Sequence, residues 1–376
     1  MTYRPEFEPA MREALRLARR GLLRARPNPL VGAVVLKGGR IVGRGAHERY
    51  GGPHAEVVAL ADAGRRARGG VLVVTLEPCA HFGKTPPCTD AILAAGIKQV
   101  VVATLDPNPE VGGRGAALLR RKGVRVDVGC LAAAALALNE GYFSAHVRRR
   151  PWVTLKMAST LDGKLAAADG TSRYISGPET LRLAHRLRTQ HHAILVGRQT
   201  VESDDPQLTP RLARGPAPVR VVLDSRGRLP AERQVFDTRR ARTVWVTAPG
   251  VPGVRIRRLT ERGVEHLEAP RGPRGGLLLP AVLRLLLRLG LQSVLVEGGA
   301  GVATSFLRAS LVDRLVLTVA PKLLGANNVA SLGDLGIRSM KDILTLSNPS
   351  VTRMGEDAVF RGELTEPLEM LEGWDG

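Results

Sequence analysis

The residues best suited to chemistry are a small set of metal ligands with one acidic side chain beside them. His54 and Glu56 stand two positions apart at the start of an expected helix, Cys79 follows an expected strand, and Cys88 comes after the next loop. One imidazole and two thiolates give zinc three protein ligands and leave the fourth position to water, as in catalytic zinc sites. The sequence therefore predicts a hydrolytic zinc centre with His54, Cys79 and Cys88 as its ligands.

Glu56 is the candidate catalytic residue of this centre. Zinc lowers the pKa of its bound water to about 7 and so generates hydroxide at neutral pH. Because Glu56 lies two residues after His54, its carboxylate can take the proton of that water and return it to a leaving amine without binding the metal. The set fits the zinc-deaminase signature H-x-E…P-C-x-x-C except in its last spacing, since Cys79 and Cys88 are nine positions apart instead of three.

The charge balance is strongly basic, with 55 Lys and Arg against 35 Asp and Glu and a net charge of +20. Such an excess can mark a nucleic-acid binder. Here the basic residues are dispersed, and aromatic residues make up only 3% of the chain, which leaves few rings for stacking bases. We therefore expect no nucleic-acid partner and expect the positive field to serve phosphate-bearing small molecules.

Three cysteines are too few for a disulfide framework, and we expect Cys130 to belong to the core. No apolar run approaches the roughly 20 residues that span a bilayer. The first 20 residues read as an amphipathic helix rather than as a signal peptide. These features predict a soluble, cytoplasmic protein without a membrane partner.

The first half of the chain must position the metal ligands, and its pattern alternates short β-rich runs with helical ones. Strands are expected at 30–37, 40–45, 71–77, 98–106 and 124–129, and helices at 55–64, 89–95, 114–122 and 131–147. The Gly38–Gly39 pair between the first two strands is typical of a hairpin. This alternation predicts an α/β domain with a central sheet over residues 1–147.

A second α/β domain is expected over residues 151–365, because three arginines and Pro151 interrupt the pattern at 148–151. Its strands are expected at 152–159, 193–198, 219–225, 243–249, 293–299 and 313–321, and its helices near 178–190, 277–290 and 301–310. We expect the tail from about residue 365 to be peripheral. The turn at 297–301 (EGGAG) follows a strand and opens a helix, where backbone N–H groups can approach a phosphate. It lacks the G-x-G-x-x-G pattern, so a Rossmann fold is disfavoured.

Several segments in both halves closely resemble the bifunctional deaminase–reductase family of riboflavin biosynthesis. In the first half they are PNPLVGAVV (27–35), GGPHAEVVAL (51–60), LEPCAHFGKTPPCTDAI (76–92) and DPNP (106–109). In the second half they are LKMASTLDGKLA (155–166), AILVGRQTVESDDPQLTPR (193–211), VVLDS (221–225) and LVEGGAGVATSF (295–306). The segments follow the family's order, and the longer cysteine loop is one of them.

The resemblance implies an α/β protein with a cytidine-deaminase-like, three-layer N-terminal domain on a mixed sheet and a C-terminal α/β domain similar in fold to dihydrofolate reductase. The first domain would use one zinc ion to deaminate 2,5-diamino-6-(5-phosphoribosylamino)pyrimidin-4-one to the corresponding uracil. The second would use NADPH to reduce the ribosyl side chain to ribityl. The family commonly forms dimers or larger assemblies, so a homo-oligomer is expected.

The resemblance also assigns site residues. Glu56 resembles the proton shuttle, and His54, Cys79 and Cys88 resemble the zinc ligands. The pyrimidine and phosphoribosyl positions are Asn28, His47, Lys84, Asp106 and Asn108. The NADPH positions are Ala158, Tyr174, Thr200, Asp204, Ser225, Gly298, Gly299, Ala300 and Gly301, with Tyr174 where many relatives carry tryptophan. The reductase substrate positions are Lys156, Ser172, Arg188, Leu208, Arg211 and Glu297.

Bland alternatives exist for some of these residues. Asn28 and Asn108 stand beside prolines and could serve as turn residues. Arg188 and Arg211 suit phosphate because guanidinium forks match its oxygens, but each could be an ordinary surface arginine. Lys156 and Glu297 could influence protonation at the reacting centre, and the sequence does not identify the acid.

Two rival functions are compatible with the zinc motif. In the first, the chain deaminates a nucleic-acid base and its second domain binds RNA, which predicts salt-sensitive RNA binding and no NADPH oxidation. In the second, the metal only stabilises a non-catalytic scaffold, and replacing Glu56 with glutamine would change nothing.

Overall fold

The computed structural model describes residues 5–82, 86–171, 175–365 and 370 of the chain. Three predicted site residues, Lys84, Ser172 and Tyr174, lie outside these ranges. The chain divides after Arg148 into two compact units. We expected the tail from about residue 365 to be peripheral, but Met370 is only 1% exposed. Within the described ranges, none of the helices combines the length and the apolar character that crossing a bilayer requires.

The first unit is built on a five-stranded mixed sheet in the order β2–β1–β3–β4–β5. Its strands are β1 (Gly32–Lys37), β2 (Arg40–Ala46), β3 (Val71–Val74), β4 (Gln99–Val102) and β5 (Arg125–Val128). β1 pairs antiparallel with β2 and β3, whereas β3, β4 and β5 run parallel. Gly38 and Gly39 form the predicted hairpin turn, both with a positive φ.

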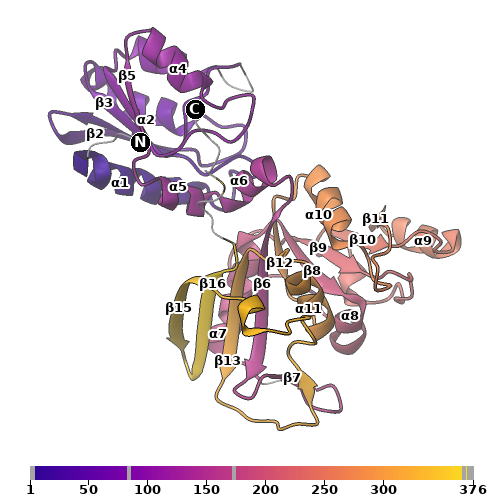
Figure 1. Ribbon diagram of the computed structural model, residues 1–376. Helices are drawn as coiled ribbons and strands as arrows, with labels where there is room; N and C mark the ends of the chain where they lie inside the picture. The colour runs from indigo at the N-terminus through magenta and orange to yellow at the C-terminus, as the bar shows by residue number, and fades with distance from the viewer. Residues whose placement is uncertain (1–4, 83–85, 172–174, 366–369, 371–376) are drawn as a thin grey trace. The chain divides into compact units, whose positions relative to one another are not determined.

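Helices cover both faces of this sheet, so the predicted three-layer arrangement is confirmed (Figure 1). They are α1 (Glu8–Ala18), α2 (Ala55–Ala63), α3 (Cys88–Ala94), α4 (Arg114–Arg121), α5 (Ala132–Leu138) and α6 (Glu140–Val147), with 3-10 turns at Pro5–Phe7, Arg19–Gly21 and Gly64–Ala67. Alternate strand residues face opposite sides. Val34, Val73 and Val101 pack with α1 and α5, whereas Leu72 and Val100 pack with α2, α3 and α4.

The single closing helix predicted over 131–147 is wrong, because Asn139 divides it into α5 and α6. The buried Asn139 side chain accepts a hydrogen bond from Leu30 N (2.7 Å) and donates one to Leu30 O (2.9 Å). These bonds hold Asn139 at the junction, where its φ of −121° lies outside the α-helical region. The break gives α6 a separate start, and α6 carries Tyr142.

Two glycines of β2 let α2 lie directly on the sheet. A Cβ at Gly43 would stand 2.3 Å from Ala59 O, and one at Gly45 would stand 2.1 Å from Ala55 O. Any side chain at these positions would therefore push the helix away. The close packing fixes the beginning of α2, where His54 and Glu56 stand.

The second unit contains a nine-stranded sheet in the order β11–β10–β9–β8–β12–β6–β13–β16–β15. The strands are β6 (Trp152–Thr160), β8 (Ala193–Gly197), β9 (Val219–Leu223), β10 (Thr243–Thr247), β11 (Glu265–Glu268), β12 (Ser293–Val296), β13 (Arg314–Ala320), β15 (Ser347–Met354) and β16 (Asp357–Glu363). Neighbours from β11 to β13 run parallel, and β16 and β15 add an antiparallel edge. β7 (Lys164–Ala166) and β14 (Val329–Ala330) form a separate pair.

The helices of this unit are α7 (Pro178–Gln190), α8 (Arg198–Asp204), α9 (Gly253–Thr260), α10 (Leu279–Arg288) and α11 (Ala300–Arg308), with 3-10 turns at Gln234–Phe236 and Met340–Asp342. Both units are thus α/β, as predicted. The sequence analysis missed the β15–β16 hairpin (Figure 1). β15 is exposed along nearly its whole length, so it carries no alternation of apolar and polar residues.

A buried carboxylate joins the first strand of this unit to the segment before β13. Asp313 is fully buried; its Oδ2 accepts hydrogen bonds from Val153 N (2.7 Å) and Arg150 Nη1 (2.6 Å), and its Oδ1 accepts from Arg150 Nη2 (2.6 Å). Asp313→Ala should lower the free energy of unfolding of this unit by about 3–5 kcal/mol, because it removes the buried carboxylate that the Arg150 guanidinium and Val153 N share. Urea denaturation followed by the emission of buried Trp152 and Trp245 measures this change.

The matched control is Glu232→Ala, which breaks an exposed ion pair with Arg258 in the same unit. It should cost no more than about 1 kcal/mol. If Asp313→Ala were as mild as this control, the carboxylate would not hold the unit together.

Candidate functional site

The structure brings His54, Cys79 and Cys88 together from three segments. His54 precedes α2, Cys79 follows β3, and Cys88 is the first residue of α3. His54 Nδ1 lies 3.2 Å from Cys88 Sγ and 3.6 Å from Cys79 Sγ, and the three ligand atoms all lie within 4.8 Å of one another. Zinc bond lengths in a tetrahedron imply about 3.5 Å between a nitrogen and a sulfur ligand. The donor set and its spacing therefore fit zinc.

The cluster is prepared to hold a cation because one of its sulfurs ionises easily. A hydrogen bond from the Cys88 side chain, together with His54, lowers the pKa of Cys79 to about 4 despite burial. The same contact and burial raise the pKa of Cys88, and the contact with Cys79 raises the pKa of His54. Cys79 is thus a thiolate at neutral pH, which is the form that binds metals.

Glu56 lies in the first turn of α2 and is only 3% exposed. Burial raises the pKa of Glu56 to about 7, partly offset by the nearby His54. A carboxyl group with such a pKa can both accept and donate a proton at neutral pH. Both the position of Glu56 beside the three ligands and its pKa therefore suit a residue that transfers protons.

His54, Glu56 and Cys79 line a cavity of about 280 Å³. Four of the five predicted pyrimidine and phosphoribosyl residues line it: Asn28, His47, Asp106 and Asn108. The fifth, Lys84, is outside the described residues. The motifs at 27–35, 51–60, 76–92 and 106–109 therefore contribute to one cavity.

His47 and Asn28 form a pair inside this cavity. His47 Nδ1 lies 3.0 Å from Pro53 O, and Asn28 Nδ2 lies 3.0 Å from His47 Nε2. Since the carbonyl can only accept, Nδ1 carries the proton of the neutral ring, and Nε2 accepts from the amide. Burial lowers the pKa of His47, which favours this neutral form. In this arrangement His47 orients Asn28, and its part in holding the pyrimidine or phosphoribosyl group stays a prediction.

Asp106 is buried in the wall of the cavity. Burial raises the pKa of Asp106 to about 6, against hydrogen bonds that its carboxylate accepts from Asn108 N (2.8 Å) and from the Tyr142 hydroxyl (2.9 Å). Asn108 Oδ1 in turn accepts from Glu110 N (3.1 Å), so Asn108 also has the turn role considered for it.

Two residues that form hydrogen bonds with the segment around Asp106 were not predicted from the sequence. Tyr142 lines the cavity and binds Asp106, but it stands in a helix with no motif to mark it. Glu77 is buried, and its carboxylate accepts hydrogen bonds from the backbone N–H groups of Asp106 (3.2 Å), Gly113 (2.8 Å) and Ala116 (2.9 Å). Its place beside Pro78 and Cys79 was the available signal for Glu77.

In the second unit, Arg188 and Glu297 form a bidentate ion pair beside Lys156. Arg188 Nε lies 3.1 Å and Nη2 2.7 Å from the Glu297 carboxylate oxygens, and the two side chains are only 12% and 11% exposed. Lys156 lies on β6 next to β12, which Glu297 follows. Arg188 is therefore no ordinary surface arginine, and its fork is directed at Glu297.

In this cluster the neighbouring charges oppose the effect of burial on each group's pKa. Burial alone would raise the pKa of Glu297, but Arg188 and Lys156 lower it. Burial lowers the pKa of Lys156, and Glu297 opposes that effect. The cluster thus combines one acidic and two basic side chains at the carboxyl end of β12.

The glycine-rich turn is packed against α8. The Thr200 hydroxyl accepts a hydrogen bond from Gly299 N (3.1 Å), and a Cβ at Gly298 would stand 2.6 Å from Val302. The predicted cofactor residues Thr200, Gly298, Gly299, Ala300 and Gly301 therefore lie together at the N-terminus of α11. The others are more scattered along the chain: Ala158 is on β6, Asp204 ends α8, and Ser225 follows β9.

Leu208 and Arg211 belong to one segment, but one side chain is buried and the other is exposed. Leu208 is 4% exposed and packs in the core with Val196 and Trp245, so its side chain has a packing role. Arg211 is exposed, and its Nη1 donates to Gln207 Oε1 (2.9 Å). Burial, with the charges of Arg188 and Arg211, lowers the pKa of His185 to about 4, which places Arg211 near the ion-pair cluster.

Comparisons with known proteins cover both units. Residues 151–360 match the RibD C-terminal domain, and residues 5–104 match the cytidine and deoxycytidylate deaminase zinc-binding region. The riboflavin biosynthesis protein RibD of Aquifex aeolicus is 46% identical over 351 residues, which cover 93% of this chain and 96% of that protein.

Solved structures show the same full-length likeness. RibD of Acinetobacter baumannii superposes with a TM-score of 0.85 at 35% identity, covering 96% of this chain and 99% of the other. A diaminohydroxyphosphoribosylaminopyrimidine deaminase/5-amino-6-(5-phosphoribosylamino)uracil reductase from Thermotoga maritima gives 0.80 at 37% identity, covering 95% and 98%. The similarity therefore includes both units and the order in which they occur.

Proposed function

Since the chain belongs to the RibD family of riboflavin biosynthesis proteins, we propose that its two units catalyse two successive steps of that pathway. The chain is a bifunctional deaminase and reductase. We assign deamination of 2,5-diamino-6-(5-phosphoribosylamino)pyrimidin-4-one to residues 1–147. Reduction of the resulting 5-amino-6-(5-phosphoribosylamino)uracil, with NADPH, is assigned to residues 151–365.

The observation that carries the deaminase assignment is the His54, Cys79 and Cys88 cluster, with Glu56 lining the same cavity as His54 and Cys79. A zinc ion at the cluster would supply hydroxide at neutral pH. Glu56 takes the proton of the attacking water and gives it to the exocyclic amine, so that a C–O bond forms and ammonia leaves. Asn28, Asp106 and Asn108 supply the amide and carboxylate groups that orient the pyrimidine.

The size of the cavity supports a small-molecule substrate. At about 280 Å³ it is close to the lower end of the roughly 300–1,000 Å³ range of ligand sites. It suits one phosphorylated pyrimidine, and we propose neither nucleic acid nor membrane as a partner.

The reductase assignment depends on Lys156, Arg188 and Glu297. NADPH would supply a hydride to C1′ of the ribosyl group. For C1′ to accept it, the bond from C1′ to the ring oxygen first breaks; that oxygen takes a proton, and the lone pair of the attached nitrogen forms a C1′=N bond, which the hydride then reduces. We assign the delivery of this proton to Lys156, which lies on the strand next to β12; burial lowers its pKa and so makes the ammonium a better acid. Arg188 keeps Glu297 ionised and oriented.

The remaining assignments concern cofactor number, location and assembly. We propose one zinc ion per chain, held by the His/Cys/Cys group found among the described residues. A cytoplasmic location suits a metal site with two reduced thiols. A homo-oligomer is supported by an apolar groove beside β13 and β16, where Leu161 is 67% exposed; the molar mass in solution tests it.

Consumption of NADPH tests the reductase half of the proposal. The zinc-loaded chain should oxidise NADPH when 5-amino-6-(5-phosphoribosylamino)uracil is added. The loss of NADPH absorbance measures this oxidation. A folded, zinc-loaded chain that bound RNA with a steep salt dependence and oxidised no NADPH would favour the rival nucleic-acid deaminase.

Tyr142→Phe should move the acid limb of deamination to higher pH. The Tyr142 hydroxyl is one of the hydrogen bonds that lower the pKa of Asp106, so its loss raises that pKa further above about 6. Asp106 then becomes protonated, and loses its charge for the substrate, at a higher pH than in the wild type. The pH profile of kcat/KM measures the shift. In an Asp106→Asn background, Tyr142→Phe should produce no shift; a shift there would show that another group is responsible.

A further inference from the structure

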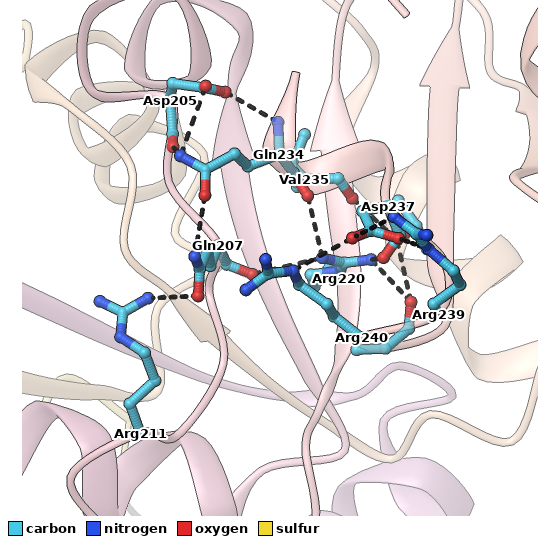
Figure 2. Close-up of polar contacts among 11 residues, drawn as sticks. Asp205, Gln207, Arg211, Arg220, Gln234, Val235, Asp237, Arg239 and Arg240 are labelled. Atoms are coloured by element: carbon cyan, nitrogen blue, oxygen red, sulfur yellow. Dashed lines mark hydrogen bonds and ion pairs between the residues drawn. The ribbon is translucent and has the colours of Figure 1, made fainter. Parts of the chain in front are cut away.

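A buried arginine on β9, Arg220, forms hydrogen bonds with the loops around it (Figure 2). Arg220 on β9 is 0% exposed. Its Nη1 donates to the carbonyls of Gln207 (3.3 Å) and Gln234 (3.3 Å), and its Nη2 donates to those of Asp237 (2.8 Å) and Ala241 (2.7 Å). One side chain thus ties the segment after α8 to the segment before β10.

Side chains extend this connection outward to Arg211 (Figure 2). Gln234 N and Nε2 donate to Asp205 Oδ1 and O (both 2.9 Å). Gln207 Nε2 donates to Gln234 Oε1 (2.8 Å), and Gln207 Oε1 accepts from Arg211 Nη1 (2.9 Å). A continuous chain of hydrogen bonds therefore runs from Gln234 through Gln207 to the Arg211 guanidinium.

The segment needs such support because its backbone is strained. Asp205 has φ +38° and Leu208 has φ +58°, in the left-handed region that side chains other than glycine rarely adopt. Strain of this kind persists only where the surroundings hold it in place. The buried Leu208 side chain and Arg220 hold the inner side of the segment, and Gln234 holds the outer side.

We propose that Gln207 and Gln234 are positioning residues of the reductase site, which orient Arg211 toward the phosphate of the deaminated substrate. The inference rests on the proposed function. A guanidinium held in its binding geometry loses less freedom when it engages a phosphate. Arg211 is exposed, and its charge acts on His185, one helical turn from Arg188. Gln207 accepts a hydrogen bond from Nη1 of Arg211, and this contact does not involve the opposite edge of the guanidinium.

Gln207→Leu and Gln234→Leu test the proposal, since both replacements keep the size of the side chain and remove its polar atoms. Each should raise KM for 5-amino-6-(5-phosphoribosylamino)uracil about threefold to tenfold, with kcat and KM for NADPH changed less than about twofold. Glu232→Gln is the matched control: it lies two residues from Gln234 and breaks an exposed ion pair outside the network. Circular dichroism and deamination by the same preparations show that the chains are folded.

Two further arms connect the effect to Arg211 and to phosphate. In an Arg211→Ala background, Gln207→Leu should add nothing, because residues acting as one unit are not additive. With the substrate lacking its phosphate, wild type and both variants should have the same KM. A wild-type KM in the variants, or an increase that persists in either arm, would overturn the positioning role. A wild-type chain that oxidises no NADPH would instead overturn the proposed function.

Discussion

Glu56→Gln is expected to abolish deamination, lowering kcat by about 10²–10⁴-fold, the usual contribution of a positioned acid–base group. Glutamine keeps the size of the side chain but can neither take a proton from water nor pass it to the amine. Glu56 is buried in the cavity next to the metal ligands, and burial raises its pKa to about 7. Zinc content and NADPH-dependent reduction should be unchanged, because the ligands and the second unit are untouched.

Release of ammonia from the diamino substrate measures the first effect, and metal analysis of the same preparation measures the second. Asp62→Asn is the matched control, since Asp62 is an exposed carboxylate of the same helix, α2. It should keep deamination within about twofold of wild type. Deamination by Glu56→Gln at the wild-type rate would contradict the mechanism and would favour a metal that only stabilises the fold.

Glu297→Gln is expected to lower kcat/KM of the reductase by about 100-fold or more while deamination stays unchanged. The replacement removes the only negative charge of the cluster, and it leaves Arg188 and Lys156 as neighbouring half-buried cations. Removing one partner of a buried pair is costly because the other charge is left uncompensated. The unpaired Arg188 should also take a new orientation, which disturbs the site further.

NADPH oxidation with the uracil substrate measures this loss. Glu265→Gln supplies the control, because Glu265 forms a bidentate pair with Arg242 in the same unit, but with both side chains at least 40% exposed. Exposed pairs contribute little, so this variant should behave as wild type. Equal behaviour of the two variants would show that Glu297 has no special part in reduction.

The metal centre could be predicted because its information is local in the sequence. His54 and Glu56 share the start of one helix, and Cys79 and Cys88 flank one loop, so residue type and spacing already define the ligands. Most of the parallel strands could be predicted for a similar reason, since their buried runs are continuous and apolar; β11 was not predicted, because it is polar and only partly buried. The resemblance then identified which distant motifs meet.

What could not be predicted depends on contacts between distant segments. Asn139, at the junction of α5 and α6, is held by the backbone of Leu30, 109 residues away. Arg188 is recognisable as a partner of Glu297 only once folding brings α7 close to the end of β12, 109 residues further along the chain. His47 accepts from Asn28 through Nε2 because the Pro53 carbonyl fixes its tautomer. In each case the residue type permitted several roles, and the tertiary partner selected one.

The central claim is that one chain performs two ordered reactions, and product analysis of a single incubation tests it most directly. Zinc-loaded protein is given the diamino phosphoribosyl pyrimidine with and without NADPH, and the products are separated and identified. Without NADPH, the reaction should stop at 5-amino-6-(5-phosphoribosylamino)uracil with one ammonia released. With NADPH, it should proceed to the ribityl product with one NADPH oxidised. Ammonia release with no ribityl product in the presence of NADPH, or no reaction at all, would contradict the account.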